Sequence, residues 1–508
     1  MSVKSSPQNN EQQVEGLMLV ICLLLVWIIS ARAPLDTDMW WHLRAGESTL
    51  ASGKPLLMDI FSFTRGGEGW MNHSWFSEVL MALAYRGLGY SGLAGWVALT
   101  ACATMLMVWT RLEGPPLYRA VWLLAAAIFS SLAWAPRPQI MSLLFLAVLE
   151  ELIETSRQGK PKWLWALPLL FAVWSNLHAG YSLGFILIAA ILTGDGLDWL
   201  LTGKSLKPAS ALALWAGLAG LATLINPNGL NTWRVVFSTV DVQALQQFIS
   251  EWASPDFHQL DQLLFLLFFL FCTVILVLCK ERVSGADLAK FFAFSLLAFY
   301  ARRNIAPFAV IAAPAAARAL HRGLDGLIAP GSPLKRVSLA MRQWFQQANR
   351  PQHPFLLRAR KWLNLGMAAV LGVVGLGKLY SVSHPVMMDR YLSESYPVKA
   401  VEWLRSQSDM GNLLNEYDWG GYLIWFARDV PVFIDGRTDL YGDKILGDWI
   451  RLVQGGEGAD ELLERYEIET LLLRPNRPLA RLLVAEDWKT VYADDQAVIL
   501  QREAKNQP

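Results

Sequence analysis

Long apolar segments recur along the whole chain and are separated by short polar loops. About eleven of these segments contain roughly 15 to 20 mainly apolar residues, close to the length needed to cross a bilayer. The pattern therefore predicts a polytopic α-helical membrane protein with about 11 transmembrane helices. The segments are 16–31, 91–110, 118–135, 139–154, 163–176, 180–198, 208–226, 262–279, 288–301, 305–320 and 363–380.

The composition supports a membrane protein. Hydrophobic residues make up 54% of the 508 positions and charged residues only 17%, a balance typical of chains that lie largely in lipid. A net charge of +1 does not indicate a nucleic-acid partner. The four cysteines all lie in apolar segments, where they resemble small hydrophobic residues and not a disulfide framework or a zinc site.

The distribution of Lys and Arg predicts an orientation. The segment 75–89 is apolar but short and carries Glu78 and Arg86, so we interpret it as a helix that lies in the membrane interface. If this segment does not cross the membrane and the N-terminus is cytoplasmic, the basic clusters all lie in cytoplasmic loops, as the positive-inside rule requires. The topology places 1–380 in a transmembrane domain and 381–508 in an extracytoplasmic domain. The basic clusters lie at 111–119, 157–162, 204–207, 280–290 and 321–362.

The remaining polar residues fall at the outer ends of the predicted spans. Each has an ordinary explanation when taken alone, such as an arginine that reaches the interface or an Asn-Pro pair that starts a turn. A charge in a span is nevertheless costly, at about 2.5–3.5 kcal/mol at full depth and less near the interface. Because these residues all lie on one side of the membrane, they predict a polar cavity there. The residues are Asp36, Asp38, Arg137, Asn176, His178, Asn226, Glu251, Arg302 and Arg303.

The first outer loop, residues 32–90, begins with an acidic pair. Asp36 and Asp38 are followed at once by the segment 40–53, WWHLRAGESTLASG, which we expect to form an interfacial helix with its indole rings among the lipid headgroups. An acidic pair at the end of a membrane helix can act as a general base, hold a divalent cation, or lie in solvent. The residues alone leave these three roles open.

The C-terminal region alternates between helical and extended patterns, which predicts a small α/β layer. Helices are expected at 397–407, 420–427 and 459–468, and strands at 412–417, 430–436, 469–475, 488–494 and 497–503. Asp435 and Arg437 lie in the segment FIDGRTD, which favours either a tight turn with a positive φ at Gly436 or a site that binds an acceptor.

The organisation resembles the GT-C superfamily of membrane glycosyltransferases. The resemblance rests on one crossing, an acidic residue at the start of a large outer loop, a Gly-containing helix (FSEVLMALAYRGLGYSG) before the second crossing, many further spans and an outer C-terminal domain. Within this superfamily, the chain is similar to the bacterial branch that includes lipid A sugar transferases and protein mannosyltransferases. This resemblance implies a multi-pass protein of the bacterial cytoplasmic (inner) membrane.

The resemblance also implies a chemistry. Such enzymes move a sugar from a polyprenyl-phosphate-linked donor to an extracytoplasmic glycolipid, glycan or protein, typically with inversion. Asp36 or Asp38 would then be the general base, with a divalent cation (Mg or Mn) held by both as a further role. Arg137, Arg302, Arg303, His42 and His178 would bind the donor phosphate. The substrate-binding candidates are Asn176, Asn226, Glu251, Asp435 and Arg437.

Several features depart from the better-marked members of that superfamily. A second acidic pair in another outer loop is missing, and the WWDYG signature of oligosaccharyltransferases is absent, although Tyr417-Asp418-Trp419-Gly420-Gly421 is superficially similar. A transporter or flippase of lipid-linked substrates, or a non-catalytic scaffold that presents the C-terminal domain, stay open as alternatives. The donor sugar and the acceptor are not determined by the sequence.

Overall fold

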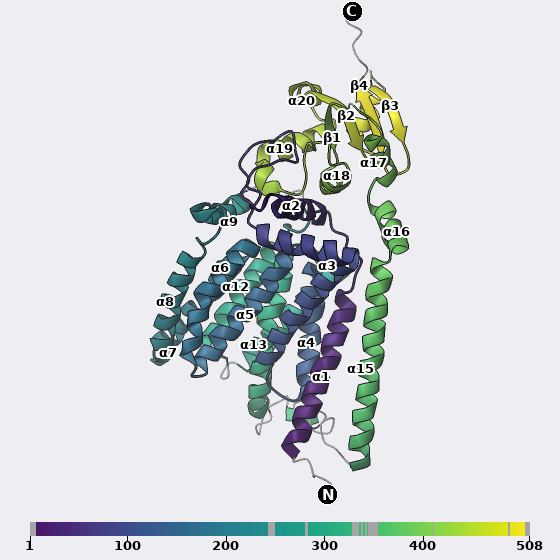
Figure 1. Cartoon of the computed structure of the whole chain (residues 1–508). Helices are drawn as coiled ribbons and strands as arrows, with labels where there is room; N and C mark the ends of the chain where they lie inside the picture. Colours follow the sequence, from purple (N-terminus) through teal and green to yellow (C-terminus); the bar gives the residue numbers. More distant parts are fainter. Residues whose placement is uncertain are drawn as a thin grey trace, which may run out of the picture.

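The structure is a computed structural model that describes residues 7–241, 249–279, 283–327, 335–336, 339–340, 343, 354–408, 410–485 and 488–502. A bundle of long helices forms one part of the molecule, and a smaller layer of helices and strands covers one end of it (Figure 1). We call this the sheet-side end of the bundle. Helix α1 (Pro7–Ser30) begins at the opposite end and runs toward the sheet-side end.

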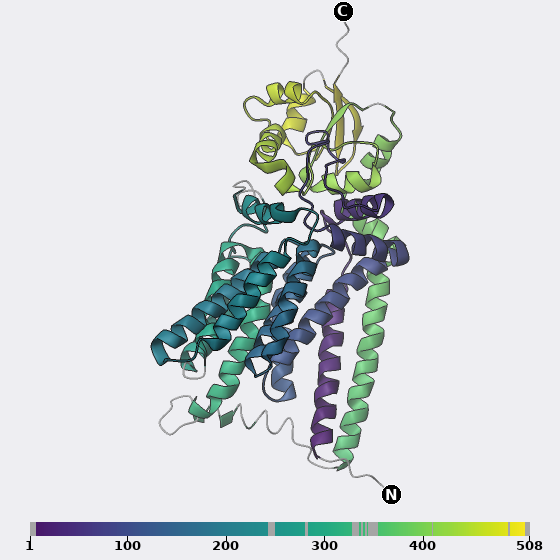
Figure 2. The same ribbon diagram turned by 60° about the vertical axis from the view of Figure 1, so that its left-hand side comes forward.

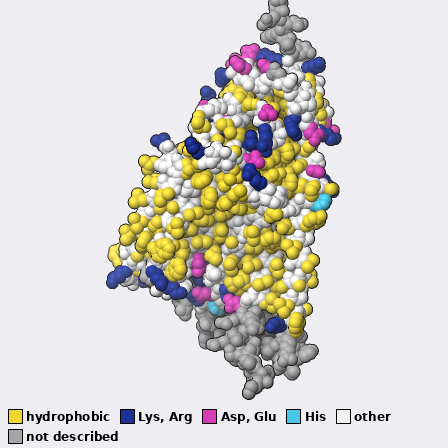
Figure 3. Space-filling view, viewed as in Figure 1, with side chains coloured by type: hydrophobic (Ala, Val, Ile, Leu, Met, Phe, Trp, Pro, Cys, Tyr) yellow, Lys and Arg dark blue, Asp and Glu magenta, His cyan; other side chains and the backbone are white. Residues whose placement is uncertain are grey.

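Each predicted apolar segment overlaps a helix. Five helical segments among the described residues are long and apolar enough to cross a membrane: 75–111, 116–133, 181–202, 260–278 and 361–383. Figure 3 shows hydrophobic side chains over the face of the bundle, with charged side chains gathered at its far edge and over the α/β layer. The chain is therefore a membrane protein. The number of eleven transmembrane helices stays a prediction. The remaining bundle helices are α3 (Trp75–Arg111), α4 (Pro116–Ser130), α5 (Gln139–Arg157), α6 (Ala166–Leu177), α7 (Tyr181–Thr202), α8 (Lys207–Ala222), α11 (Leu260–Leu278), α12 (Gly285–Tyr300), α13 (Ile305–Leu327) and α15 (Pro354–Ser383).

Helix α3 is sharply bent at Gly89. This glycine has φ 57° and ψ −140°, a conformation that a residue with a Cβ atom adopts only with strain. The part before Gly89 runs across the sheet-side end, and the part after it runs along the bundle (Figures 1 and 2). The apolar stretch at 75–89 is thus turned away from the direction of the spans.

Helix α2 (Met39–Ser52) lies between α3 and the C-terminal region. Trp40 is fully buried and Trp41 is 5% exposed. The ring of Trp40 meets those of Tyr396 and Tyr422 at centroid distances of 6.0 and 5.7 Å. The prediction that these indole rings lie among lipid headgroups is therefore wrong, because the C-terminal region covers the helix and buries them in protein.

The C-terminal region contains a four-stranded sheet in the order β1-β2-β4-β3. Strands β1 and β2 are parallel, and β4 pairs antiparallel with both β2 and β3. The predicted helices and four of the five predicted strands are present. The elements are α16 (Pro385–Ser395), α17 (Val398–Arg405), β1 (Asn412–Asn415), η6 (Tyr417–Trp419), α18 (Gly420–Phe426), α19 (Thr438–Val453), α20 (Ala459–Arg465), β2 (Ile468–Leu473), α21 (Pro478–Leu483), β3 (Trp488–Ala493) and β4 (Val498–Arg502).

The predicted strand at 430–436 is wrong. Val432 forms only isolated bridges, to Ser62 and Leu413. The side chain of Asn415 replaces further ladder bonds: its Oδ1 accepts from Phe433 N at 2.8 Å and its Nδ2 donates to Ile434 O at 2.8 Å. A side chain that satisfies the backbone in this way removes the need for a paired strand.

Buried ion pairs join four helices near the opposite end of the bundle. Arg111 pairs with Glu150, and Lys290 Nζ lies 2.9 Å from Glu150 Oε1 and 3.0 Å from Asp287 Oδ1. Arg318 Nη2 lies 2.9 Å from Asp287 Oδ1. These pairs link α3, α5, α12 and α13. A separate cluster of polar residues lies at the sheet-side end.

Candidate functional site

Three acidic side chains surround Arg137 at the sheet-side end. Its Nε pairs with Asp36 Oδ1, and its Nη1 lies 3.1 Å from Asp38 Oδ2 and 3.2 Å from Glu251 Oε1. Asp36 and Asp38 follow α1, Arg137 precedes α5, and Glu251 precedes α11. The structure thus brings together four predicted residues that lie far apart in the sequence. We call them the acidic cluster.

Local geometry orients the acidic pair. Asp36 Oδ1 accepts a hydrogen bond from the backbone N of Asp38 at 2.9 Å, a turn that aspartate commonly makes two residues ahead. Trp41 Nε1 donates to Asp38 Oδ1 at 3.3 Å. Asp36 is therefore tied to backbone and to Arg137, while Asp38 faces an indole and a guanidinium.

Burial and neighbouring charges shift the pKa values of Asp38 and Arg137 in the acidic cluster. Burial raises the pKa of the Asp38 carboxyl to about 7; Arg137 opposes this rise, and Asp36 and Glu251 add to it. Burial alone would lower the pKa of Arg137, but the three carboxylates hold it well above its usual range. Asp38 consequently exchanges its proton near neutral pH, where a general base is most effective.

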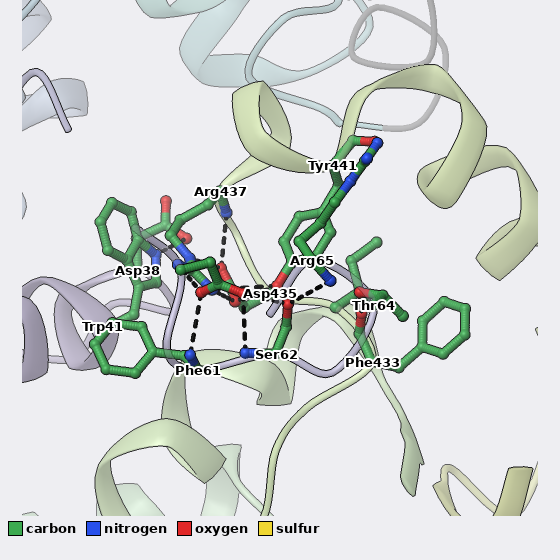
Figure 4. Close-up of polar contacts among 12 residues, drawn as sticks. Asp38, Trp41, Phe61, Ser62, Thr64, Arg65, Phe433, Asp435, Arg437 and Tyr441 are labelled. Carbon is green, nitrogen blue, oxygen red and sulfur yellow. Dashed lines mark hydrogen bonds and ion pairs between the residues drawn. The ribbon is translucent and has the colours of Figure 1, made fainter. Parts of the chain in front are cut away.

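The loop at 435–437 closes over Asp38. A Cβ atom at position 436 would lie 1.8 Å from Asp38 Oδ1 and 3.2 Å from Trp41 Nε1, so only glycine fits without displacing the carboxylate. Gly436 does not have a positive φ, so the alternative of a tight turn with a positive φ at this glycine is wrong. Close approach to the acidic pair, and not turn geometry, requires it. Figure 4 shows Asp38 and Trp41 beside Asp435 and Arg437.

Asp435 and Arg437 belong to a buried network. Arg437 Nη1 lies 2.6 Å from Asp59 Oδ1, and its Nη2 lies 2.6 Å from Asp435 Oδ2, with all three side chains fully buried. Tyr441 OH donates to Asp435 Oδ2 at 2.6 Å. The network joins the segment that contains Asp59 to the C-terminal region and so supports the loop at 435–437. Sequence reasoning did not select Asp59, whose ion-pair partner Arg437 lies 378 positions away.

The other two arginines retain donor capacity. Arg303 stacks on Trp252 at 4.4 Å and donates to Gln139 Oε1 at 3.4 Å. Arg302 Nη2 donates to Ser250 Oγ at 3.0 Å. Among the described residues neither guanidinium forms an ion pair of 4.0 Å or less, in contrast to Arg137. The backbone nitrogen of Arg303 donates to Glu251 O at 3.2 Å, which places this segment beside the acidic cluster.

His42 is buried and His178 is half-buried, and both bind protein groups. His42 Nδ1 lies 2.9 Å from Glu78 Oε1, whose other oxygen accepts from Asn72 Nδ2 at 2.7 Å. His178 Nδ1 accepts from Gly180 N at 2.9 Å and lies 2.9 Å from Ser142 Oγ. Burial lowers the pKa of both imidazoles well below the usual value, so both are neutral at pH 7.

The predicted amides hold the loops of this end in place. Asn176 Oδ1 accepts from Trp75 Nε1 at 2.8 Å, and its Nδ2 donates to Ile225 O at 2.7 Å. Asn226 Oδ1 accepts from Asn228 N at 2.7 Å. The structure does not bring either amide into contact with the acidic cluster.

Tyr417 is a neighbour of Asp38 that sequence reasoning did not select. Burial raises the pKa of Tyr417 well above its usual value, and the carboxylates of Asp38, Asp435 and Asp418 add to the rise. Tyr417 begins η6 in the segment YDWGG. A Cβ atom at Gly421, in the same segment, would overlap with Thr37 O. The similarity of YDWGG to an oligosaccharyltransferase signature was the available signal.

The acidic cluster does not fit a divalent cation. Arg137 binds both carboxylates of the acidic pair, which is the position that a metal would occupy. In the part of the chain that the structure describes, no group of three or more His, Cys, Asp or Glu side chains could hold a metal ion. The acidic cluster therefore does not provide a site for Mg or Mn.

Comparisons with solved structures identify similar folds. The archaeal oligosaccharyltransferase AglB from Archaeoglobus fulgidus, in complex with an inhibitory peptide and a dolichol-phosphate, matches with a TM-score of 0.59 at 12% identity, over 91% of this chain and 70% of that chain. The apo form of an Archaeoglobus fulgidus oligosaccharyltransferase matches with a TM-score of 0.50 at 12% identity, over 89% and 69%. ArnT from Cupriavidus metallidurans in the apo state gives 0.48 at 14% identity, over 96% and 98%. No family model and no curated protein matches the sequence significantly.

Proposed function

We propose that this chain, which has the fold of the GT-C membrane glycosyltransferases, transfers a sugar from a polyprenyl-phosphate-linked donor to an acceptor outside the cytoplasm. The acidic cluster around Arg137 is the observation that supports this function best. AglB, with the same fold, was solved with a dolichol-phosphate and a peptide. Those two molecules suggest a lipid-linked donor and a separate acceptor for this chain.

Asp38 is the general base in this proposal. The acceptor hydroxyl oxygen attacks the anomeric carbon, the bond from that carbon to the phosphate oxygen breaks, and Asp38 takes the hydroxyl proton. Polyprenyl phosphate leaves, and the anomeric configuration inverts. A pKa of about 7 suits Asp38 to this proton transfer, whereas Asp36 positions Arg137 and the backbone of Asp38.

Arg303 and Arg302 bind the donor phosphate. Both lie beside Glu251 or its neighbour Ser250, and a guanidinium is well suited to phosphate oxygens because its donors form a planar fork. Arg137 is occupied by three carboxylates, so its role is to hold the acidic cluster together. This assignment divides the predicted phosphate-binding arginines into two groups with different partners.

Donor cleavage in membranes tests the proposal. Asp38→Asn should reduce the release of polyprenyl phosphate from lipid-linked sugars by about 10²-fold or more, the range for loss of a general base, as measured by mass spectrometry. Asp429→Asn changes an exposed aspartate of the same region and should leave the rate unchanged. Full activity in Asp38→Asn would exclude the proposed base. A flippase would move the lipid-linked sugar without cleaving it, and a scaffold would do neither.

A further inference from the structure

A groove in the C-terminal region is separate from the acidic cluster. It has a volume of about 410 Å³, within the range of roughly 300–1,000 Å³ that is typical of ligand sites. The end of α16, the turn η6, and two loops that adjoin β2 and β4 form its walls. Six of its lining residues carry the argument: Tyr396, Trp419, Arg474, Asn476, Asp495 and Gln496.

One wall of the groove contains a buried donor without a partner. The side chain of Trp419 is 3% exposed, and its Nε1 has no hydrogen-bond partner within the described part of the chain. An unpaired buried donor is unfavourable because it has lost its hydrogen bonds to water. A ligand hydroxyl or carbonyl oxygen that reached the indole from the groove would remove this cost.

The walls of the groove pack against the elements that hold the acidic pair. Tyr396 packs edge-on against Trp40 with a centroid distance of 6.0 Å, and the next residue, Trp41, donates to Asp38. On the other wall, Trp419 lies two residues before Gly421, whose backbone packs directly on Thr37 between the two aspartates. A ligand in the groove therefore lies next to the elements that hold Asp36 and Asp38.

The charge of the groove disfavours an anionic ligand. Arg474 is already paired, with its Nη1 3.2 Å from Glu416 Oε2 and its Nη2 3.2 Å from Asp418 Oδ2. Asp495 and Glu394 add negative charge to the lining. A phosphate group would thus meet acidic side chains without a spare cation, whereas a neutral polar ligand would meet donors and acceptors of both kinds.

From these observations we propose that the groove binds a neutral sugar ring of the acceptor. The amide of Asn476, the side-chain oxygen of Gln496 and the carboxylate of Asp495 offer donors and acceptors to sugar hydroxyls, and the indole donor of Trp419 lies unpaired in the wall of the groove. The identification of this sugar as part of the acceptor rests on the proposed glycosyl transfer. The binding of sugar in the groove is independent of it.

Binding of simple glycosides to the purified full-length protein tests the groove. The probes are the methyl glycosides of glucose, galactose, mannose and N-acetylglucosamine, followed by saturation-transfer NMR and titration. Asn476 is exposed and has no hydrogen bond to another described residue, so Asn476→Ala should fold normally and weaken binding about three- to ten-fold, the loss expected for one hydrogen bond. Trp419→Phe keeps the aromatic ring but removes the donor and should have a similar effect.

Two controls separate the possible results. Gln454→Ala changes an exposed glutamine outside the groove and should leave glycoside affinity unchanged. Asp38→Asn should also retain it, so loss of donor cleavage with intact glycoside binding supports both proposals. Glycoside binding with full activity in Asp38→Asn would refute the proposed base and leave the sugar-binding groove standing.

The sugar-binding groove would be overturned by any of three results. These are no binding of any of the four glycosides to the wild-type protein, unchanged affinity in both groove variants, or binding of a pool of neutral tripeptides in place of the glycosides.

Discussion

Replacing Gly436 by alanine should displace the carboxylate of Asp38 while leaving the fold intact. The new Cβ atom would lie 1.8 Å from Asp38 Oδ1, whereas real Cβ contacts are essentially never shorter than 3.0 Å. The carboxylate must therefore move by about 1 Å or more, which disturbs its contacts with Trp41 Nε1 and Arg137. A shift of this size at a reacting group lowers turnover by about 10²-fold. The clash involves the end of a side chain, so the cost in stability should be small.

Release of polyprenyl phosphate and thermal unfolding, measured on the same membrane preparations, provide the assay. We expect Gly436→Ala to lose turnover with a nearly unchanged unfolding temperature. Gly447→Ala is the matched control, because nothing lies within 4 Å of a Cβ atom at this position of α19, and it should keep full turnover. Wild-type turnover in a folded Gly436→Ala protein would refute the placement of Asp38 at the reacting centre.

Three further predictions concern charge and topology. With Asp38 as base, turnover should fall as the pH drops below about 7, and Glu251→Gln should move the inflection to lower pH because Glu251 raises the pKa of Asp38; an unmoved inflection would contradict this. Since that folded-state pKa lies above the unfolded value of about 3.9, the contribution of Asp38 to stability is complete below about pH 4 and is lost as the pH rises through about 7. Arg437→Met leaves Asp59 and Asp435 buried without their cation and should lower the free energy of unfolding by about 3–5 kcal/mol, measured by denaturant titration, whereas Arg390→Met removes only an exposed pair and should change it little. A reporter fused near residue 340 should be cytoplasmic and one fused at 508 external; the reverse would invert the proposed orientation.

Sequence patterns predicted the elements well where the signal is local. The apolar segments overlap helices because a run of apolar side chains is a property of the segment itself. The strand predicted at 430–436 was wrong because the amide of Asn415, 18 positions before Phe433, binds its backbone. Helix α2 shows the same limit of sequence patterns. Its amphipathic pattern is real, but the C-terminal region, and not lipid, buries Trp40.

The candidate site was predictable in its parts but not in its arrangement. Charge topology placed the acidic pair, Arg137 and Glu251 on one side of the membrane, and the structure brings them into contact. The contacts of Gly436 with Asp38 and of Arg437 with Asp59 link positions several hundred residues apart. Sequence spacing carries no information about such contacts.

Membrane class, helical segments and the side on which the polar residues gather follow from the order of apolar and charged residues, since burial of a segment in lipid depends on its own composition. Packing decided the rest. The raised pKa of Asp38, the occupation of Arg137 by three carboxylates and the unpaired indole of Trp419 exist only after the bundle and the C-terminal region meet. Desolvation and ion pairing depend on every neighbour in space, and those neighbours are assembled by tertiary contacts.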